Sequence, residues 1–259
     1  MAWALWIIAG LLVIAAGTLA LLSTHPSPSE TFWSNVIYAV GTGYVRVLHR
    51  LKVRGREHIP PARDAGPLIV VANHTAGVDP ILVSAACPFQ IRWIMAEDMR
   101  LPWLGWFWRW QSVIFVSRSG RDRGSVRTAL EHLNKGGVIG IFPEGGLERP
   151  SRQVLPFRRG VGLLINKAAV PVLPVFIDGT PQVDPAWASL WHPSRSTIEF
   201  GPSIDYASTG FGPGEIADDL HRRYLAWSGW PANDHPRQTL AEVTDDERAD
   251  DHAAVEHPA

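Results

Sequence analysis

Apolar and polar positions divide this chain into an N-terminal apolar run and a longer part in which short apolar stretches alternate with mixed ones. Residues 2–22 hold no charged side chain and are almost wholly apolar, and a helix of that length crosses the hydrocarbon core of a bilayer. A secretory signal peptide would need a positive start, but no Lys or Arg precedes residue 46. We therefore expect residues 1–24 to form a transmembrane or membrane-embedded helix.

A second helical pattern, over residues 30–52, mixes Trp, Tyr and Phe with other apolar positions. This pattern is typical of an amphipathic helix, which lies either in the membrane interface or against its own domain. Five basic residues follow the apolar run: Arg46, Arg50, Lys52, Arg54 and Arg56. By the positive-inside rule they place the globular part in the cytoplasm, behind a single N-terminal anchor. The pattern fits a spanning first helix as well as a shallow two-helix hairpin.

After residue 60, β-branched and apolar runs alternate with helical patterns. Strands are predicted at residues 68–72, 91–96, 113–116, 138–142, 172–177 and 197–200. Helices are predicted at residues 80–86, 125–133, 161–168 and 216–227. This alternation predicts an α/β fold with a mixed, mostly parallel sheet flanked by helices.

Charge separates the C-terminal end from the rest of the chain. The formal net charge is −1, yet residues 237–259 alone carry seven acidic and two basic side chains, without an aromatic residue. We expect residues 235–259 to form a disordered acidic tail and residues 53–232 to form the globular domain. The single Cys87 excludes an internal disulfide, and no Cys/His cluster has the spacing of a zinc site.

A dense aromatic segment runs from the second predicted strand towards the third. Its members are Trp93, Trp103, Trp106, Phe107, Trp108 and Trp110. Some of these rings are expected in the core. Because Trp is also favoured where an apolar ring meets water at a membrane surface, the segment is equally a candidate for interfacial contact or for a soluble binding face.

The first candidate for chemistry follows the predicted strand 68–72, where the chain reads Asn73-His74-Thr75-Ala76-Gly77-Val78-Asp79. Histidine titrates closest to neutral pH, and a nearby carboxylate fixes its tautomer and raises its basicity. If His74 and Asp79 touch, they form a general base that can take a proton from an alcohol. The other interpretation is a helix start, with Asp79 as N-cap and Pro80 at the first helical position.

Two further predicted strands end in residues that suit a ligand site. Arg118 follows the strand 113–116, and Glu144, Gly145 and Gly146 follow the strand 138–142. Ligands of open α/β sheets gather at the carboxyl ends of the strands, so one crevice can hold these residues together with His74. An arginine binds phosphate bidentately, and glycines let the backbone approach a ligand closely.

Four sequence blocks, taken in order, resemble those of a known family. They are Asn73-His74 with Asp79, residues 113–118 (VIFVSR), residues 142–145 (FPEG) and residues 170–175 (VPVLPV). Over roughly residues 30–205 the chain resembles the 1-acyl-sn-glycerol-3-phosphate (lysophosphatidic acid) acyltransferases and the wider glycerolipid acyltransferase family. The resemblance implies that residues 53–232 are an acyltransferase domain with the fold of this family.

The resemblance also implies an activity. An acyl group would pass from acyl-CoA or acyl carrier protein to the hydroxyl of a lysophospholipid, first of all 1-acyl-glycerol-3-phosphate, to give phosphatidic acid. His74 would deprotonate the acceptor and Asp79 would orient it. The acceptor site would be shaped by Arg118, Glu144, Gly145 and Gly146. No cofactor is implied, since the acyl thioester is a co-substrate, and the expected partners are membrane lipids and the acyl donor, with no nucleic acid and no metal.

The chain departs from the family pattern in the residues expected to recognise a phosphate. Gly146 and Leu147 stand where the third block usually continues with Thr and Arg, and Glu97 stands where a basic residue is common. Three arginines are candidates to compensate: Arg149, Arg152 and Arg158. The acceptor therefore stays open among lysophosphatidic acid, another lysolipid and a hydroxylated lipid without a phosphomonoester. A non-catalytic lipid-binding protein of the same fold is the remaining alternative, because a lipid hydrolase would need a Gly-x-Ser-x-Gly elbow that this chain lacks.

Overall fold

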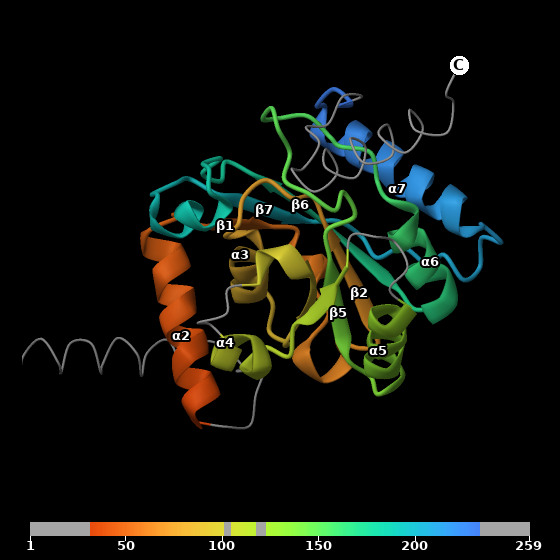
Figure 1. Ribbon diagram of the computed structural model, residues 1–259, viewed down its shortest axis with the longest axis horizontal. Helices are drawn as coiled ribbons and strands as arrows, with labels where there is room; N and C mark the ends of the chain where they lie inside the picture. The colour runs from red at the N-terminus through yellow and green to blue at the C-terminus, as the bar shows by residue number, and fades with distance from the viewer. Residues whose placement is uncertain (1–31, 101–104, 118–122, 234–259) are drawn as a thin grey trace, which may run out of the picture.

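The computed structural model describes residues 32–100, 105–117 and 123–233 (Figure 1). The predicted membrane helix at residues 1–24 and the predicted acidic tail at residues 235–259 lie outside these ranges. The described part is a seven-stranded sheet with helices on both faces. This arrangement confirms the predicted mixed, mostly parallel α/β architecture.

The strands lie in the order β1-β7-β6-β2-β5-β3-β4. Their bounds are β1 Lys52–Arg54, β2 Leu68–Ala72, β3 Arg92–Ala96, β4 Ile114–Val116, β5 Val138–Ile141, β6 Val172–Asp178 and β7 Thr197–Phe200. Neighbouring strands are parallel except β6 and β7, which pair antiparallel. The carboxyl ends of β2 to β6 therefore meet at one edge of the sheet, while β1 and β7 run the other way.

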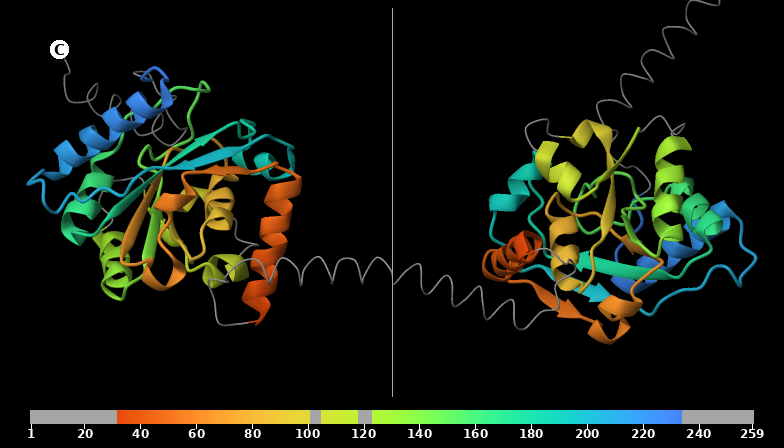
Figure 2. Two further views of the ribbon diagram at one scale, coloured as in Figure 1. Left: turned by 180° about the vertical axis from the view of Figure 1, so that it is seen from behind. Right: turned by 90° about the horizontal axis from the view of Figure 1, so that it is seen from below.

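Helices cover both faces of this sheet. Their bounds are α2 Phe32–Val47, α3 Asp79–Ala86, α4 Gly105–Trp110, α5 Arg123–Asn134, α6 Arg159–Ala168 and α7 Pro213–Ser228, with short 3-10 helices at Arg56–His58, Ala62–Asp64, Glu97–Met99 and Ala186–Trp191. Figures 1 and 2 show α5, α6 and α7 on one face and α2, α3 and α4 on the other.

The central strand β2 explains why the sheet is covered twice. Leu68, Val70 and Ala72 belong to the apolar core under α3, whereas Ile69 and Val71 belong to the core under α5, α6 and α7. Successive side chains of a strand point to opposite faces, so an unbroken apolar run needs a partner on each side. All five residues are buried.

Two elements of the described part were not predicted, β1 and α4. The three residues of β1 alternate between exposed and half-buried positions, so the segment carries almost no apolar signal. Helix α4 (GWFWRW) lies within the aromatic segment, where periodicity is hard to read because nearly every position is aromatic. The six strands and four helices predicted after residue 60 are all present, with ends shifted by a few residues.

The predicted amphipathic helix at residues 30–52 corresponds to α2, which packs on α3. The Tyr38 hydroxyl donates to the backbone carbonyl of Ser84 at 2.6 Å and also to that of Cys87. Ile37, Val40 and Val47 of the same helix are exposed. Contact of this exposed surface with a membrane stays a prediction. Within the described ranges, no helix is both long enough and apolar enough to span a bilayer.

Candidate active site

The loops after β2 and β5 come together at the carboxyl edge of the sheet. These strands are parallel neighbours, with Val71 opposite Ile141, so His74 and Glu144 leave the sheet side by side. The backbone N–H of His74 donates to Oε2 of Glu144 at 3.0 Å. Two of the three residues expected in one crevice are thus in contact. The third, Arg118, lies outside the described residues.

Asp79 is the centre of a closed turn. Its fully buried carboxylate accepts through Oδ2 from Nδ1 of His74 at 3.0 Å and from the backbone N–H groups of Thr75 and Ala76 at 2.6 and 2.8 Å. The Thr75 hydroxyl donates to Oδ1 at 3.2 Å. The interpretation of Asp79 as N-cap is wrong, because Val78 is the N-cap residue and Asp79 is already helical. The carboxylate bonds to the residues before it instead.

Glu144 supports the backbone of His74 from a buried position. Its side chain is shielded from water, and its Oε1 makes no hydrogen bond within the described structure. Burial, opposed by the single N–H of His74 and reinforced by the negative charges of Glu148 and Asp79, raises the pKa of Glu144 well above its usual range. The protonated form of Glu144 is therefore favoured, and its carboxyl group supports the backbone of the loop that carries His74.

Glu148 is a third buried acid beneath the same loop, and sequence reasoning missed it. Its backbone N–H donates to the carbonyl of His74 at 2.8 Å. Its Oε1 accepts from the N–H of Arg152 at 3.0 Å and from the amide of Gln182. Burial is the largest cause that raises the pKa of Glu148 to about 7. An acid in a run of charged residues usually lies in solvent, so nothing local in the sequence indicates this burial.

The imidazole of His74 lies in a stack of three rings. Phe142 stacks on it with ring centroids 4.0 Å apart and 16° between the planes. Trp93 of β3 stacks on Phe142, with centroids 4.8 Å apart and 10° between the planes. The hydrogen bond to Asp79 sets the rotation of the imidazole within its plane, and the stack sets the plane itself.

Asn73 fixes the start of the catalytic loop to the neighbouring strand. Its buried amide donates to the carbonyl of Ile177 at 3.0 Å and accepts from the N–H of the same residue at 2.7 Å. An Asn side chain offers one donor and one acceptor side by side, which matches the two backbone groups of one residue on β6. The loop therefore leaves β2 from a fixed point.

Two of the three arginines proposed to compensate for the missing phosphate ligand are engaged with the protein. Arg149 donates to the carbonyls of Glu148 and Thr75 at 2.7 and 3.2 Å, and its guanidinium lies 3.4 Å from Oδ1 of Asp184. Arg152 pairs with Asp178 at 3.3 Å. Arg149 is largely buried and ties the two loops together. These contacts of both side chains are with protein groups.

The third arginine, Arg158, lies over the glycine turn. Its Nε donates to the carbonyl of Glu144 at 3.2 Å. Gly145 has φ +70°, and a Cβ there would lie 2.4 Å from that Nε, so the position requires glycine both for its backbone and for its neighbour. At Gly146 an added Cβ would meet nothing within 4 Å. The turn thus places the Arg158 side chain against the carbonyl of Glu144, the residue whose carboxyl group bonds to the backbone of His74.

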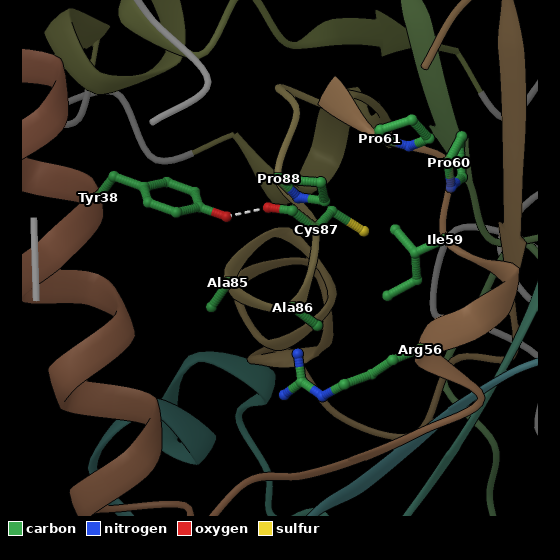
Figure 3. A pocket seen from close by; sticks show the side chains of 9 residues that line it. All are labelled: Tyr38, Arg56, Ile59, Pro60, Pro61, Ala85, Ala86, Cys87 and Pro88. Carbon is green, nitrogen blue, oxygen red and sulfur yellow. Dashed lines mark hydrogen bonds between the residues drawn. The ribbon is translucent and has the colours of Figure 1, made fainter. Parts of the chain in front are cut away.

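Two cavities of the described part lie away from His74. One, of about 260 Å³, lies where α2 and the end of α3 meet the segment 56–61, and is lined among others by Tyr38, Arg56 and Cys87 (Figure 3). The other, of about 350 Å³, lies at the amino ends of β2, β3 and β5 beside the glycine turn 136–137. Among the described residues, no three His, Cys, Asp or Glu side chains form a group that could hold a metal ion.

The geometry leaves His74 one nitrogen for chemistry. Nδ1 faces a carboxylate that can only accept, so the Nδ1 proton lies between them and Nε2 keeps its lone pair. The side chain is 19% exposed, which lets a substrate reach it while most of the ring is covered. Such a pair at the carboxyl edge of a mostly parallel α/β sheet has the geometry that a general base acting on a hydroxyl requires.

Comparison with known proteins agrees with this class. Residues 50–178 match the family model described as Acyltransferase. The chain is 28% identical over 199 residues to the 1-acyl-sn-glycerol-3-phosphate acyltransferase of Pseudomonas aeruginosa, covering 75% of this chain and 70% of that one. The chain belongs to the acyltransferase family that includes these enzymes.

Other relatives cover shorter stretches. The enzymes of the same name from Bacillus subtilis and Saccharomyces cerevisiae are 28% and 27% identical, each over half of this chain, which spans 63% and 43% of their respective lengths. The crystal structure of the LPA acyltransferase PlsC from Thermotoga maritima superposes with a TM-score of 0.62, at 22% identity, over 86% of this chain and 91% of that one. This likeness confirms the fold.

Proposed function

We propose that the protein is a membrane-bound O-acyltransferase. It moves a fatty acyl group from acyl-CoA or acyl carrier protein to the hydroxyl of a lysophospholipid, first of all 1-acyl-glycerol-3-phosphate. The observation that carries the proposal is the 3.0 Å hydrogen bond between Nδ1 of His74 and Oδ2 of the fully buried Asp79. The names of the relatives support the acceptor.

In the proposed reaction Nε2 of His74 takes the proton of the acceptor hydroxyl. The oxygen attacks the thioester carbonyl carbon, and the resulting tetrahedral intermediate breaks its C–S bond. The leaving thiolate receives the proton from the imidazolium, so His74 returns to its starting form and no acyl-enzyme is formed. Asp79 stabilises the imidazolium between these two steps because its charge lies against the other ring nitrogen.

The acceptor site in this proposal is built from Arg118, Glu144, Gly145 and Gly146. The glycine turn gives the acceptor room beside Nε2, and Arg158 and Arg118 supply positive charge for a phosphate. Glu144 would act on the acceptor site indirectly, by fixing the backbone of His74, since its carboxyl group is buried and bonded to that backbone. The exposed apolar side chains of α2, together with the predicted anchor at residues 1–24, support placement of the site at the cytoplasmic membrane surface.

A second acceptor class is favoured by a specific observation. Arg149 is held by the carbonyls of Glu148 and Thr75 and by Asp184, so it does not replace the arginine that the family pattern places at Leu147. A lysolipid or hydroxylated lipid without a phosphomonoester needs fewer positive charges. We therefore propose such a lipid as the alternative acceptor for the same chemistry.

The test is a panel of lyso-acceptors offered to the full-length membrane protein with acyl-CoA or acyl carrier protein as donor. Products are identified by mass spectrometry. We expect acyl transfer to at least one lysolipid, and its loss by a factor of about 10³ or more in His74→Ala. The exposed His192 gives a matched control, because His192→Ala removes a histidine outside the site. Equal activity of His74→Ala and the parent would contradict the proposal.

The same panel separates the two acceptor classes. Preference for lysophosphatidic acid over uncharged or zwitterionic acceptors supports the first. The reverse preference supports the second and leaves the role of His74 intact.

A further inference from the structure

We propose that Trp93 and Gly140 are positioning residues for His74. Gly140 leaves the space that the indole of Trp93 fills, Trp93 supports Phe142, and Phe142 holds the imidazole and favours its protonated form during the reaction. The inference rests on the proposed role of His74 as general base. It concerns residues outside the four sequence blocks, apart from Phe142.

The first step is the pairing of β3 with β5. Trp93 lies directly opposite Gly140 in the parallel register. A Cβ on Gly140 would lie 2.6 Å from Cε3 and 2.7 Å from Cδ2 of the indole, which is closer than real atoms come. The same Cβ would lie 2.6 Å from Cγ2 of Ile91, so a side chain at position 140 has no room between Ile91 and the indole. A glycine in the middle of a strand weakens that strand and often marks a site where another group approaches closely. Here the group that approaches the backbone of Gly140 is the indole of Trp93.

The second step is the alternation along β5. Ile139 and Ile141 belong to the core under α5, α6 and α7, whereas Trp93 and Phe142 belong to the opposite core. Positions 140 and 142 therefore face the same side, one after the other. The indole that lies over Gly140 meets the ring of Phe142 at 4.8 Å, and Phe142 meets His74 at 4.0 Å.

The third step is the anchorage of the indole. Its Nε1 donates to the Ser84 hydroxyl at 3.0 Å, and the side chain is almost completely buried. Ser84 lies on α3, the helix that begins with Asp79. One helix thus fixes the imidazole twice, at its edge through a carboxylate and at its face through the aromatic stack.

The chemical consequence concerns the imidazolium. The face of an aromatic ring carries negative potential and attracts a cation that lies over it. His74 becomes positive only after it has taken the proton of the acceptor, so the stack with Phe142 strengthens in the intermediate. An interaction that is stronger in the intermediate than in the ground state raises kcat and leaves KM unchanged.

The experiment compares Trp93→Leu, Gly140→Ala and the conservative Trp93→Phe in the full-length protein. In Trp93→Leu and Gly140→Ala we expect kcat to fall about five- to tenfold with KM within about twofold. The acid limb of the pH profile of kcat/KM should move to lower pH by about half a unit, because the protonated imidazole loses support. Trp93→Phe keeps an aromatic ring, so kcat and the position of the acid limb should both stay close to those of the parent.

Two further measurements keep the test decisive. Trp108→Leu removes a buried Trp that contacts Trp187 and not Phe142, so it controls for general loss of packing. The titration midpoint of the His74 ring, followed by NMR on the folded variants, needs no substrate and should fall in Trp93→Leu but not in Trp108→Leu.

An unchanged midpoint in Trp93→Leu, or an equal fall in Trp108→Leu, would overturn the positioning role. If Trp93→Leu fails to fold, Ser84→Ala weakens only the anchorage, and an unchanged midpoint there would overturn the role as well. Absence of acyl transfer in the parent would instead contradict the proposed function, since the midpoint comparison holds without it.

Discussion

Two buried turns meet at His74, and they treat their carboxyl groups differently. In residues 74–79 the carboxylate of Asp79 accepts from an imidazole, two backbone N–H groups and a hydroxyl. In residues 144–148, Glu144 and Glu148 each keep one buried oxygen without a hydrogen bond within the described structure.

The number of donors decides what each acid does. A carboxylate surrounded by donors is held as an acceptor, and Asp79 can therefore orient a base. Where donors are few, the cost of burying a charge prevails and the pKa rises, as it does for both glutamates. In the proposed reaction the first turn would supply the negative charge beside the imidazole, whereas in the second turn burial favours the neutral form of both glutamates.

The strongest way to break this contrast is Asp79→Asn. The amide keeps the shape and can still direct its oxygen at Nδ1, but it loses the charge that stabilises the imidazolium. We expect kcat to fall by about 10² to 10⁴. Circular dichroism should show an intact fold, and acyl transfer is measured with the best acceptor of the panel. Retention of more than a tenth of the activity would contradict the role given to Asp79.

The second test follows stability against pH. The folded state holds the proton of Glu148 up to about pH 7, whereas the unfolded chain loses it near 4.5. Between these values the folded state binds more protons, so stability falls as pH rises, and the loss is complete above pH 7. Glu144 acts in the same direction.

In Glu148→Gln the amide oxygen can still accept from Arg152 and Gln182. Unlike the carboxyl group, the amide stays uncharged at every pH, so no charge has to be buried. We expect the variant to be more stable than the parent at pH 8 by on the order of 1–2 kcal/mol, and no more stable at pH 5. Urea denaturation at both pH values measures this. Parallel pH dependence of parent and variant would show that Glu148 is not the titrating group.

A smaller effect is expected for Glu144→Gln. Since burial raises the pKa of Glu144 well above its usual range and favours the neutral acid, a neutral amide should still accept the N–H of His74. Activity at pH 7 should stay within about threefold of the parent, in contrast to Asp79→Asn. Glu144→Ala, which leaves that buried N–H without an acceptor, should cost about 1–3 kcal/mol of stability. A loss of activity in Glu144→Gln as large as that in Asp79→Asn would show that the reaction depends on both carboxyl groups alike, and it would contradict the contrast between the two turns.

The smallest effect is expected at Arg152→Gln. Its ion pair with Asp178 is exposed on both sides, and such pairs contribute about 0–1 kcal/mol. Thermal unfolding should change by no more than about 2 °C. The largely buried Arg149 is the matched comparison, because Arg149→Gln leaves several carbonyls without a donor and should destabilise more.

The sequence was sufficient for what local patterns encode. The β-branched run at residues 68–72 predicted β2. The five-residue spacing of His74 and Asp79 allowed a contact without requiring it, and the family resemblance gave the pair its role. The three-residue β1 escaped because it is too short and too exposed to form a pattern.

Long-range contacts were out of reach of the sequence. Phe142 and Trp93 stack on neighbouring strands that are 49 positions apart, and the sequence does not state the order of strands in the sheet. Nothing in the sequence indicated that Glu148 is buried, because its surroundings include Gln182 from the loop after β6. The role predicted for Arg118 stays a prediction.

The position of β2 between β5 and β6 has a consequence for synthesis. The strand is complete at residue 72, but its partner residues on β6 begin at position 172. At about 5–20 residues per second, the ribosome needs about 5–20 s to make the intervening chain. Both edges of this apolar strand are unpaired until β5 follows at residues 138–141, and the edge that β6 covers stays unpaired throughout. Nascent chains that end before β6 should therefore depend on chaperones and aggregate without them.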